Sequence, residues 1–223
     1  MKRNEIIFYT AILAVVNVPL LFGGMFESMI FVPSNILNGQ VWRIVTHPFV
    51  HVSLYHLLLD GIAFLMLYNQ LEAKTFSGRT VYVAAAAVFS MLAVMLVLPY
   101  STAVGYCGLS GIDHGLMAVC ALEMIRSKDT DRAGRWFGLI SLLVVLGKSL
   151  YEAYSGHMFL EFMHFGMMGL PVAISHLGGV IGGVTAFAVC YAIRFGLDKT
   201  HGFKGLGRYG HLNCEKEYIK AVV

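Results

Sequence analysis

Ser110 and His176 are the residues of this chain best suited to nucleophilic catalysis. Ser110 lies in residues 108–111, which read Gly-Leu-Ser-Gly, and His176 stands near the start of a later apolar segment. A serine hydroxyl attacks when a neutral imidazole accepts its proton. Residues 108–111 match the Gly-x-Ser-Gly pattern of serine hydrolases, although no predicted strand precedes the serine as in α/β-hydrolases. The two residues predict a serine hydrolase with a Ser-His dyad.

Three apolar segments carry polar residues within their first two or three turns. The set is His51, His56, Asp60, Ser110, Asp113, His114, Ser175 and His176. His56 and Asp60 are four residues apart and share a helix face, as do Ser110 and His114. Ionisable groups inside a membrane are costly and usually face an internal cavity with a function. We therefore expect the three sets to lie at one depth and to form one site.

Two glycine patterns predict which helices touch. Gly111 and Gly115 form a small-xxx-small pattern after Ser110, and Gly179 and Gly183 repeat it after His176. Such faces let two helix backbones approach closely. If these two faces meet, the hydroxyl of Ser110 comes within reach of the imidazole. Each feature alone also has a purely structural explanation, because glycine pairs pack helices and a membrane serine commonly bonds to its own helix.

The elements that must position these residues are membrane helices. The chain of 223 residues is 57% hydrophobic and 13% charged, far more apolar than a soluble domain. Six segments approach the roughly 20 residues that a spanning helix needs. They are about 6–23, 48–69, 80–99, 109–125, 135–152 and 172–195. We predict an all-α, polytopic membrane protein with six transmembrane helices in one domain, residues 1–197, and a basic, Gly-rich cytosolic tail, 198–223.

The first apolar segment and the charges define the expected topology. The first segment follows two basic residues like a signal peptide, but it lacks a convincing small-residue cleavage site, so we expect a helix. With both termini in the cytoplasm, the inner segments hold 14 Lys and Arg residues and the outer loops hold only Arg43, while Lys148 lies in a span. The positive-inside rule supports this orientation.

Several classes of function lack support in the sequence. The net charge of +3 reflects basic residues where membrane insertion places them, so we expect contact with the lipid bilayer and no nucleic-acid partner. The four cysteines have no Cys-x-x-Cys spacing, and we expect neither a metal site nor a disulfide framework. No cofactor is expected.

Taken together, the motifs resemble those of the rhomboid family of intramembrane serine proteases. Trp42 and Arg43 look like the family's first outer loop, and residues 51–60 follow its H-x4-H-x3-N spacing with Asp60 in the last position. Residues 108–111 match its Gly-x-Ser-Gly motif, and residues 176–183 match its H-x2-G-x3-G motif. The resemblance covers residues 42–183 and implies a six-helix rhomboid-like bundle with Ser110 and His176 as the catalytic dyad.

Within that family, residues 108–115 look most like the bacterial rhombosortase subgroup. This resemblance implies a multi-pass enzyme of the bacterial inner membrane that cuts membrane-anchored proteins near the outer face, beside a Gly-Gly motif that precedes a C-terminal anchor. It also implies an oxyanion site made by the Ser110 N–H and His56, with support from Asp60, His51, His114 and Gly108.

Two positions depart from the general rhomboid pattern. His114 stands where a tyrosine usually packs against the catalytic histidine, and Asp60 stands where an asparagine usually donates to the oxyanion. An ionised Asp60 about 4 Å from an oxyanion would cost about 4 kcal/mol at an effective dielectric of 20. We expect a neutral Asp60 that donates a hydrogen bond. The alternative is an ionised Asp60 that orients His56 or another ring.

The polar residues also allow two other functions. A rhomboid-like pseudoprotease that only binds membrane clients is one alternative, and a haem protein with axial ligands among His51, His56, His114 and His176 is another. The loop 154–170 is either a flexible cap or an interfacial segment. We expect Lys148 and Glu152, four residues apart, to form a structural pair.

Overall fold

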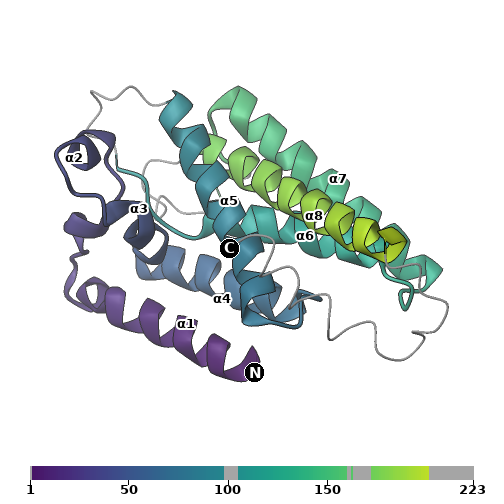
Figure 1. The fold of residues 1–223 in the computed structure, drawn as a ribbon. Helices are drawn as coiled ribbons and strands as arrows, with labels where there is room; N and C mark the ends of the chain where they lie inside the picture. The colour runs from purple at the N-terminus through teal and green to yellow at the C-terminus, as the bar shows by residue number, and fades with distance from the viewer. Residues whose placement is uncertain (1, 98–104, 160–161, 163–171, 201–223) are drawn as a thin grey trace.

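The computed structural model describes residues 2–97, 105–159, 162 and 172–200. This part of the chain consists of helices and the segments that connect them, with one isolated β-bridge between Phe31 and Tyr106. The long helices are α1 (Lys2–Val16), α4 (Leu54–Gln70), α5 (Phe76–Val97), α6 (Ser110–Arg126), α7 (Arg132–Ser155) and α8 (Ile174–Thr200). The short helices are η1 (Val18–Phe22), η2 (Glu27–Met29), α2 (Pro33–Leu37), α3 (Arg43–Thr46) and η3 (His47–Phe49). Figure 1 shows the six long helices gathered in one bundle.

The molecule is an all-helical, polytopic membrane protein. Within the described residues, four helices are long and apolar enough to span a membrane, or five if the bent pair 43–49 and 54–70 counts as one span. The six predicted segments all form helices, but α6 has only 17 residues, a length of about 26 Å against the roughly 30 Å of the hydrocarbon core. Neighbouring helices enclose α6, so its length need not match the bilayer.

Lipid-facing surfaces are visible as stripes of exposed apolar side chains. On α7 the exposed stripe consists of Trp136, Phe137, Ile140, Leu143 and Val144. Their spacing of one, three and four residues places them on one face of the helix. In water such a face would need a protein partner, whereas in a bilayer the acyl chains cover it.

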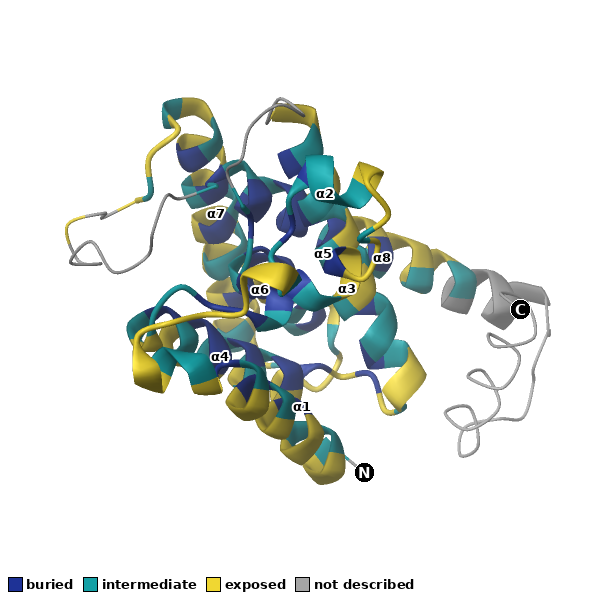
Figure 2. Cartoon of the chain, turned by 90° about the vertical axis from the view of Figure 1, so that its left-hand side faces the viewer, coloured by how far each residue is buried: buried dark blue, intermediate teal, exposed yellow. Residues whose placement is uncertain are grey.

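α6 is the central helix of the bundle. Ten of its 17 residues are buried, and it contacts α4, α5, α7 and α8. Figure 2 shows its buried surface inside a ring of helices whose outer faces are exposed. The polar residues in the first turns of α6 are therefore held away from lipid.

Glycines set the distance between α6 and α8. A Cβ atom added to Gly179 would lie 1.8 Å from the Gly111 carbonyl oxygen, and one added to Gly183 would lie 2.3 Å from the Gly115 carbonyl oxygen. The predicted contact between the two small-xxx-small faces is therefore present. A second glycine face of α8, Gly178 and Gly182, also lies close to α5, where a Cβ added to either glycine would lie 2.5 Å from a carbonyl oxygen.

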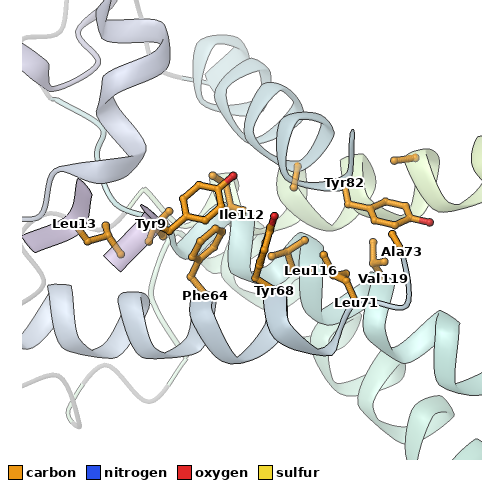
Figure 3. Close-up of a cluster of buried hydrophobic side chains, with 13 residues drawn as sticks. Tyr9, Leu13, Phe64, Tyr68, Leu71, Ala73, Tyr82, Ile112, Leu116 and Val119 are labelled. Atoms are coloured by element: carbon orange, nitrogen blue, oxygen red, sulfur yellow. The ribbon is translucent and has the colours of Figure 1, made fainter. Parts of the chain in front are cut away.

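The N-terminal segment forms a helix that is packed into the bundle. Figure 3 shows Tyr9 of α1 beside Phe64 and Tyr68 of α4, and both pairs of rings meet edge to face with centroids 5.1 Å apart. At the C-terminal end of α4, Glu5 accepts hydrogen bonds of 2.8 and 2.6 Å from the fully buried Arg79. These contacts support the prediction of a helix in this segment.

The segment between α1 and α4 is folded tightly rather than helical throughout. Buried Arg43 donates to the carbonyl oxygens of Glu27 and Ile30 at 2.7 and 2.6 Å. The chain bends by 97° between residues 43–49 and α4, and Asn17 holds the bend by accepting from the His51 N–H at 2.9 Å. The predicted span 48–69 was therefore too long at its start. Residue 51 lies in the bend, because Ser53 caps α4 and the helix begins only at Leu54.

Two predicted segments lie largely outside the described residues. Of the loop 154–170, residues 160–161 and 163–170 are not described, and of the tail 198–223, residues 201–223 are not described. The cap function of the loop and the membrane contact of the tail therefore stay predictions.

The glycine contact between α6 and α8 predicts a strong effect of a single methyl group. We expect Gly179→Ala to destabilise the protein by at least the roughly 1–3 kcal/mol typical of overpacking, because the new atom meets backbone that cannot rotate away. Thermal unfolding in detergent measures the loss. Gly147→Ala on α7 is the matched control, since nothing lies within 4 Å of its added Cβ. Equal melting temperatures for the two variants would contradict the prediction.

Candidate active site

Ser110 begins α6 immediately after a turn that requires glycine. Gly108 has φ of +99°, and its N–H donates to the His47 carbonyl oxygen at 3.1 Å. A Cβ on Gly108 would lie 2.8 Å from the ring of His56 and 3.1 Å from Asp60 Oδ2. The glycine thus serves the left-handed backbone and the close approach of α4. This turn places Ser110 beside the polar residues of α4.

His56 and Asp60 face each other across one turn of α4. Asp60 Oδ2 lies 3.0 Å from His56 Nε2 and 3.7 Å from His51 Nε2, and all three side chains are buried. The 3.0 Å separation is that of an ion pair, although the groups do not have the alignment of a hydrogen bond. The His51 and His56 rings meet edge to face with centroids 5.0 Å apart. Asp60 therefore lies close to two imidazoles.

His176 pairs with a buried carboxylate. Its Nδ1 lies 2.6 Å from Oε2 of Glu152, whose side chain is 0% exposed. The other oxygen, Oε1, accepts from Lys148 Nζ at 2.7 Å and from the Phe159 N–H at 2.8 Å. Three donors thus converge on one carboxylate, an arrangement that favours its ionised form.

Lys148 links this carboxylate to His114 and, through His114, to the backbone of Ser110. Its Nζ lies 2.8 Å from His114 Nε2, and His114 Nδ1 lies 2.7 Å from the Ser110 carbonyl oxygen. An ammonium group only donates, so Nε2 of His114 accepts and Nδ1 carries the proton toward the carbonyl. The tautomer of His114 is therefore determined by its two partners.

Stacked rings bring the start of α6 against the start of α8. The His114 and His176 rings are 4.0 Å apart and inclined by only 7°. His114 thus contacts the Ser110 backbone with one ring atom and the His176 ring with its face. The flat ring of His114 packs against His176 as the resemblance implied for this position.

The predicted polar sets of α4, α6 and α8 lie at one end of the bundle. Two other residues of the predicted set, Ser175 and Asp113, have different surroundings. Ser175 contributes its carbonyl oxygen, which accepts from Ser90 Oγ at 2.8 Å. Asp113 is buried among neighbouring helices, and its Oδ1 has no hydrogen-bond partner in the part of the chain that the structure describes. We assign no role to Asp113.

Sequence reasoning missed the contribution of α7. The spacing of Lys148 and Glu152 predicts a structural pair, and the pair is present, but Glu152 also bonds to His176 and Lys148 to His114. A fully buried carboxylate in an apolar helix was the available signal, because ionisable residues in membranes usually serve a function. Ser90 of α5 was also missed, since nothing in its sequence neighbourhood marks it.

Cys107 is the other nucleophilic side chain near Ser110. Burial raises the pKa of its thiol to about 12, and the charge of Asp60 acts in the same direction. The thiol therefore stays protonated at neutral pH, and a protonated thiol is a poor nucleophile.

The donor atoms of the site have a geometry that bears on metal and haem binding. Ligand atoms of His114, Glu152 and His176 lie within 4.8 Å of one another, a spacing that a metal ion could use. The ammonium group of Lys148 already lies between His114 and Glu152 and would repel a cation. Axial haem ligands approach from opposite faces of the porphyrin, and parallel rings 4.0 Å apart leave no room for it.

Comparison with known proteins agrees with this architecture. The family model of the Rhomboid domain matches residues 38–193, well over half of the chain. The chain is also similar to Rhomboid-like protease 3 of Toxoplasma gondii, with 29% identity over 159 residues that cover 69% of this chain and 52% of that protein. It thus spans about half the length of that relative. On the strength of the family match, this multi-pass membrane protein belongs to the rhomboid family.

Proposed function

We propose that the protein is an intramembrane serine endopeptidase that uses Ser110 as nucleophile and His176 as general base. The observation that carries the proposal is the bond between His176 Nδ1 and Glu152, because it leaves Nε2 as the nitrogen that can accept the serine proton. The stacked His114 ring and the glycine contact between α6 and α8 support the required proximity of the two residues.

The reaction would follow the acyl-transfer sequence of serine proteases. Ser110 Oγ attacks the peptide carbonyl while His176 Nε2 takes its proton, and the imidazolium then donates that proton to the leaving amine. Water hydrolyses the acyl-enzyme with His176 again as base. A helical peptide bond is shielded from attack, so the substrate helix would unwind beside α4 and α7 before it is cut.

The oxyanion would be stabilised by the Ser110 N–H and by His56. Gly108 permits the close approach of His56 to this turn, since its missing side chain is the space that His56 occupies. The 3.0 Å separation from Asp60 supports the second arrangement considered for that residue, a carboxylate that orients the His56 ring.

The substrates would be membrane proteins cut near the outer face of the membrane. Residues 108–115 support the rhombosortase-like reading, in which the enzyme removes a C-terminal anchor beside a Gly-Gly motif. The bias of positive charges supports cytoplasmic termini, and a bacterial inner membrane location follows from the rhombosortase-like reading. A pseudoprotease that only binds membrane clients is the second candidate, and the departure at Asp60 is what favours it.

Covalent labelling tests the nucleophile. We expect a fluorophosphonate probe to label the detergent-purified wild type, and we expect no labelling of Ser110→Ala or His176→Ala, since one lacks the attacking oxygen and the other lacks its base. Gel fluorescence measures the adduct. Ser149→Ala is the matched control, because it removes a buried serine hydroxyl of α7 that lies outside the proposed machinery. An unlabelled but folded wild type would favour the pseudoprotease.

Replacement of Asp60 by asparagine separates its two possible roles. We expect Asp60→Asn to slow cleavage by up to about 10²-fold, the effect of losing one oxyanion donor, because a neutral amide holds the His56 ring less firmly than a carboxylate does. The rate of cleavage of a fluorogenic membrane peptide measures the effect. Full activity of the asparagine variant would instead support a neutral Asp60 that donates to the oxyanion.

A paired substrate test examines specificity. We expect reconstituted enzyme to cut a protein with a Gly-Gly motif before its C-terminal membrane anchor roughly 10- to 200-fold faster than the same protein with Ala-Ala, the discrimination that a methyl-sized change gives in a shaped pocket. Mass spectrometry of the products locates the cut. Equal rates would argue against the rhombosortase-like reading and leave the protease proposal intact.

A further inference from the structure

We infer that Glu152 is a positioning residue that completes a Ser-His-Glu triad, and that Lys148 holds both Glu152 and His114 in place for it. This inference rests on the proposed protease function and goes beyond it, because that proposal uses the Glu152 contact only to identify the free nitrogen of His176 and assigns Glu152 and Lys148 no part in the reaction. Both residues were expected from sequence to be structural, and their contacts with His176 and His114 are what change that interpretation.

The contact with Glu152 determines which nitrogen of His176 carries the proton. A carboxylate only accepts hydrogen bonds, so the 2.6 Å contact with Glu152 Oε2 requires the proton on Nδ1. Nε2 is then unprotonated and can serve as the base. When His176 takes the serine proton, the adjacent negative charge stabilises the imidazolium, as the aspartate does in serine protease triads.

The partners of Glu152 allow it to keep its negative charge. An isolated buried carboxylate would be expensive and would tend to become neutral. Here Lys148 Nζ and the Phe159 N–H, at 2.7 and 2.8 Å, neutralise and solvate Oε1 while Oε2 faces the imidazole. The glutamate can therefore stay ionised although its side chain is fully buried.

Lys148 is shared between Glu152 and His114. Lys148 donates both to Glu152 and to His114 Nε2, and His114 in turn donates to the Ser110 carbonyl oxygen and stacks on His176. The Lys148 ammonium group thus holds both the Glu152 carboxylate and the His114 ring in position. A pair that only joined two turns of α7 would not contact either histidine.

Glu152→Gln tests the inference in the full-length protein. We expect its second-order rate of fluorophosphonate labelling to fall by about 10² to 10⁴, the upper value being the effect of the corresponding acid-to-amide change in a serine protease triad. Lys148→Met should cause a smaller loss in the same direction, because Glu152 loses its cation but keeps the Phe159 N–H and His176 as partners. Both rates are compared with the wild type.

A matched control separates positioning from simple stability. Glu5→Gln also replaces the carboxylate of an ion pair, here with the buried Arg79 near the other end of α4, although Glu5 is slightly more exposed than Glu152. We expect Glu5→Gln to label at the wild-type rate per folded molecule. Labelling of Glu152→Gln within threefold of Glu5→Gln would overturn the inference.

The tautomer of His176 gives a readout that a purely structural role would not change, and the wild type alone suffices for it. In protein carrying ¹⁵N-labelled histidine, we expect the His176 resonance to show a proton on Nδ1 and none on Nε2. A proton on Nε2 in the wild type would overturn the inference even if every variant failed to fold.

The experiments distinguish this inference from the proposed function. If the wild type is not labelled at Ser110, the protease proposal fails, and the triad fails with it. If the wild type is labelled at Ser110 and Glu152→Gln is labelled equally fast, only the role of Glu152 fails and the dyad remains.

Discussion

The contact between the backbones of α6 and α8 is the constraint on which the rest of the site depends. A Cβ added to Gly115, Gly179 or Gly183 would collide with a carbonyl oxygen of the opposite helix, and one added to Gly111 would collide with Ser90 of α5. This close approach brings together the first turns of the two helices, where the His114 and His176 rings stack 4.0 Å apart. The second glycine face of α8 permits close packing against α5 as well.

Buried charge is the second constraint, and the structure satisfies it in pairs. Glu152 with Lys148, and Glu5 with Arg79, place opposite charges 2.7 and 2.6 Å apart at two separate points of the bundle. In a low-dielectric interior an unpaired charge would be far more costly than such a pair. The pair near His176 differs from the other because both of its members also bond to histidines, which gives a structural necessity a chemical use.

Much of the architecture was predictable because a bilayer imposes a simple rule on sequence. Each apolar segment long enough to span had to satisfy its backbone internally, so helices were the expected outcome. The residues of the proposed site on α4, α6 and α8 were also predictable, since polar side chains are rare in such segments. The bend before α4 was not, because it depends on the long-range Asn17 contact, and the Ser53 cap shows where the helix begins.

The sequence by itself determined the class of the protein, its helices, the glycine faces and the candidate nucleophile and base. These are local properties, which depend on composition and on spacing along one segment. Only the tertiary structure decided which partner each polar atom takes. It turned Asp60 toward His56, and it joined Glu152 to His176 across 24 positions of the chain. Such pairings depend on the rotation and depth of helices relative to one another, because a spacing of four residues specifies a face of a helix but not the helix that this face meets.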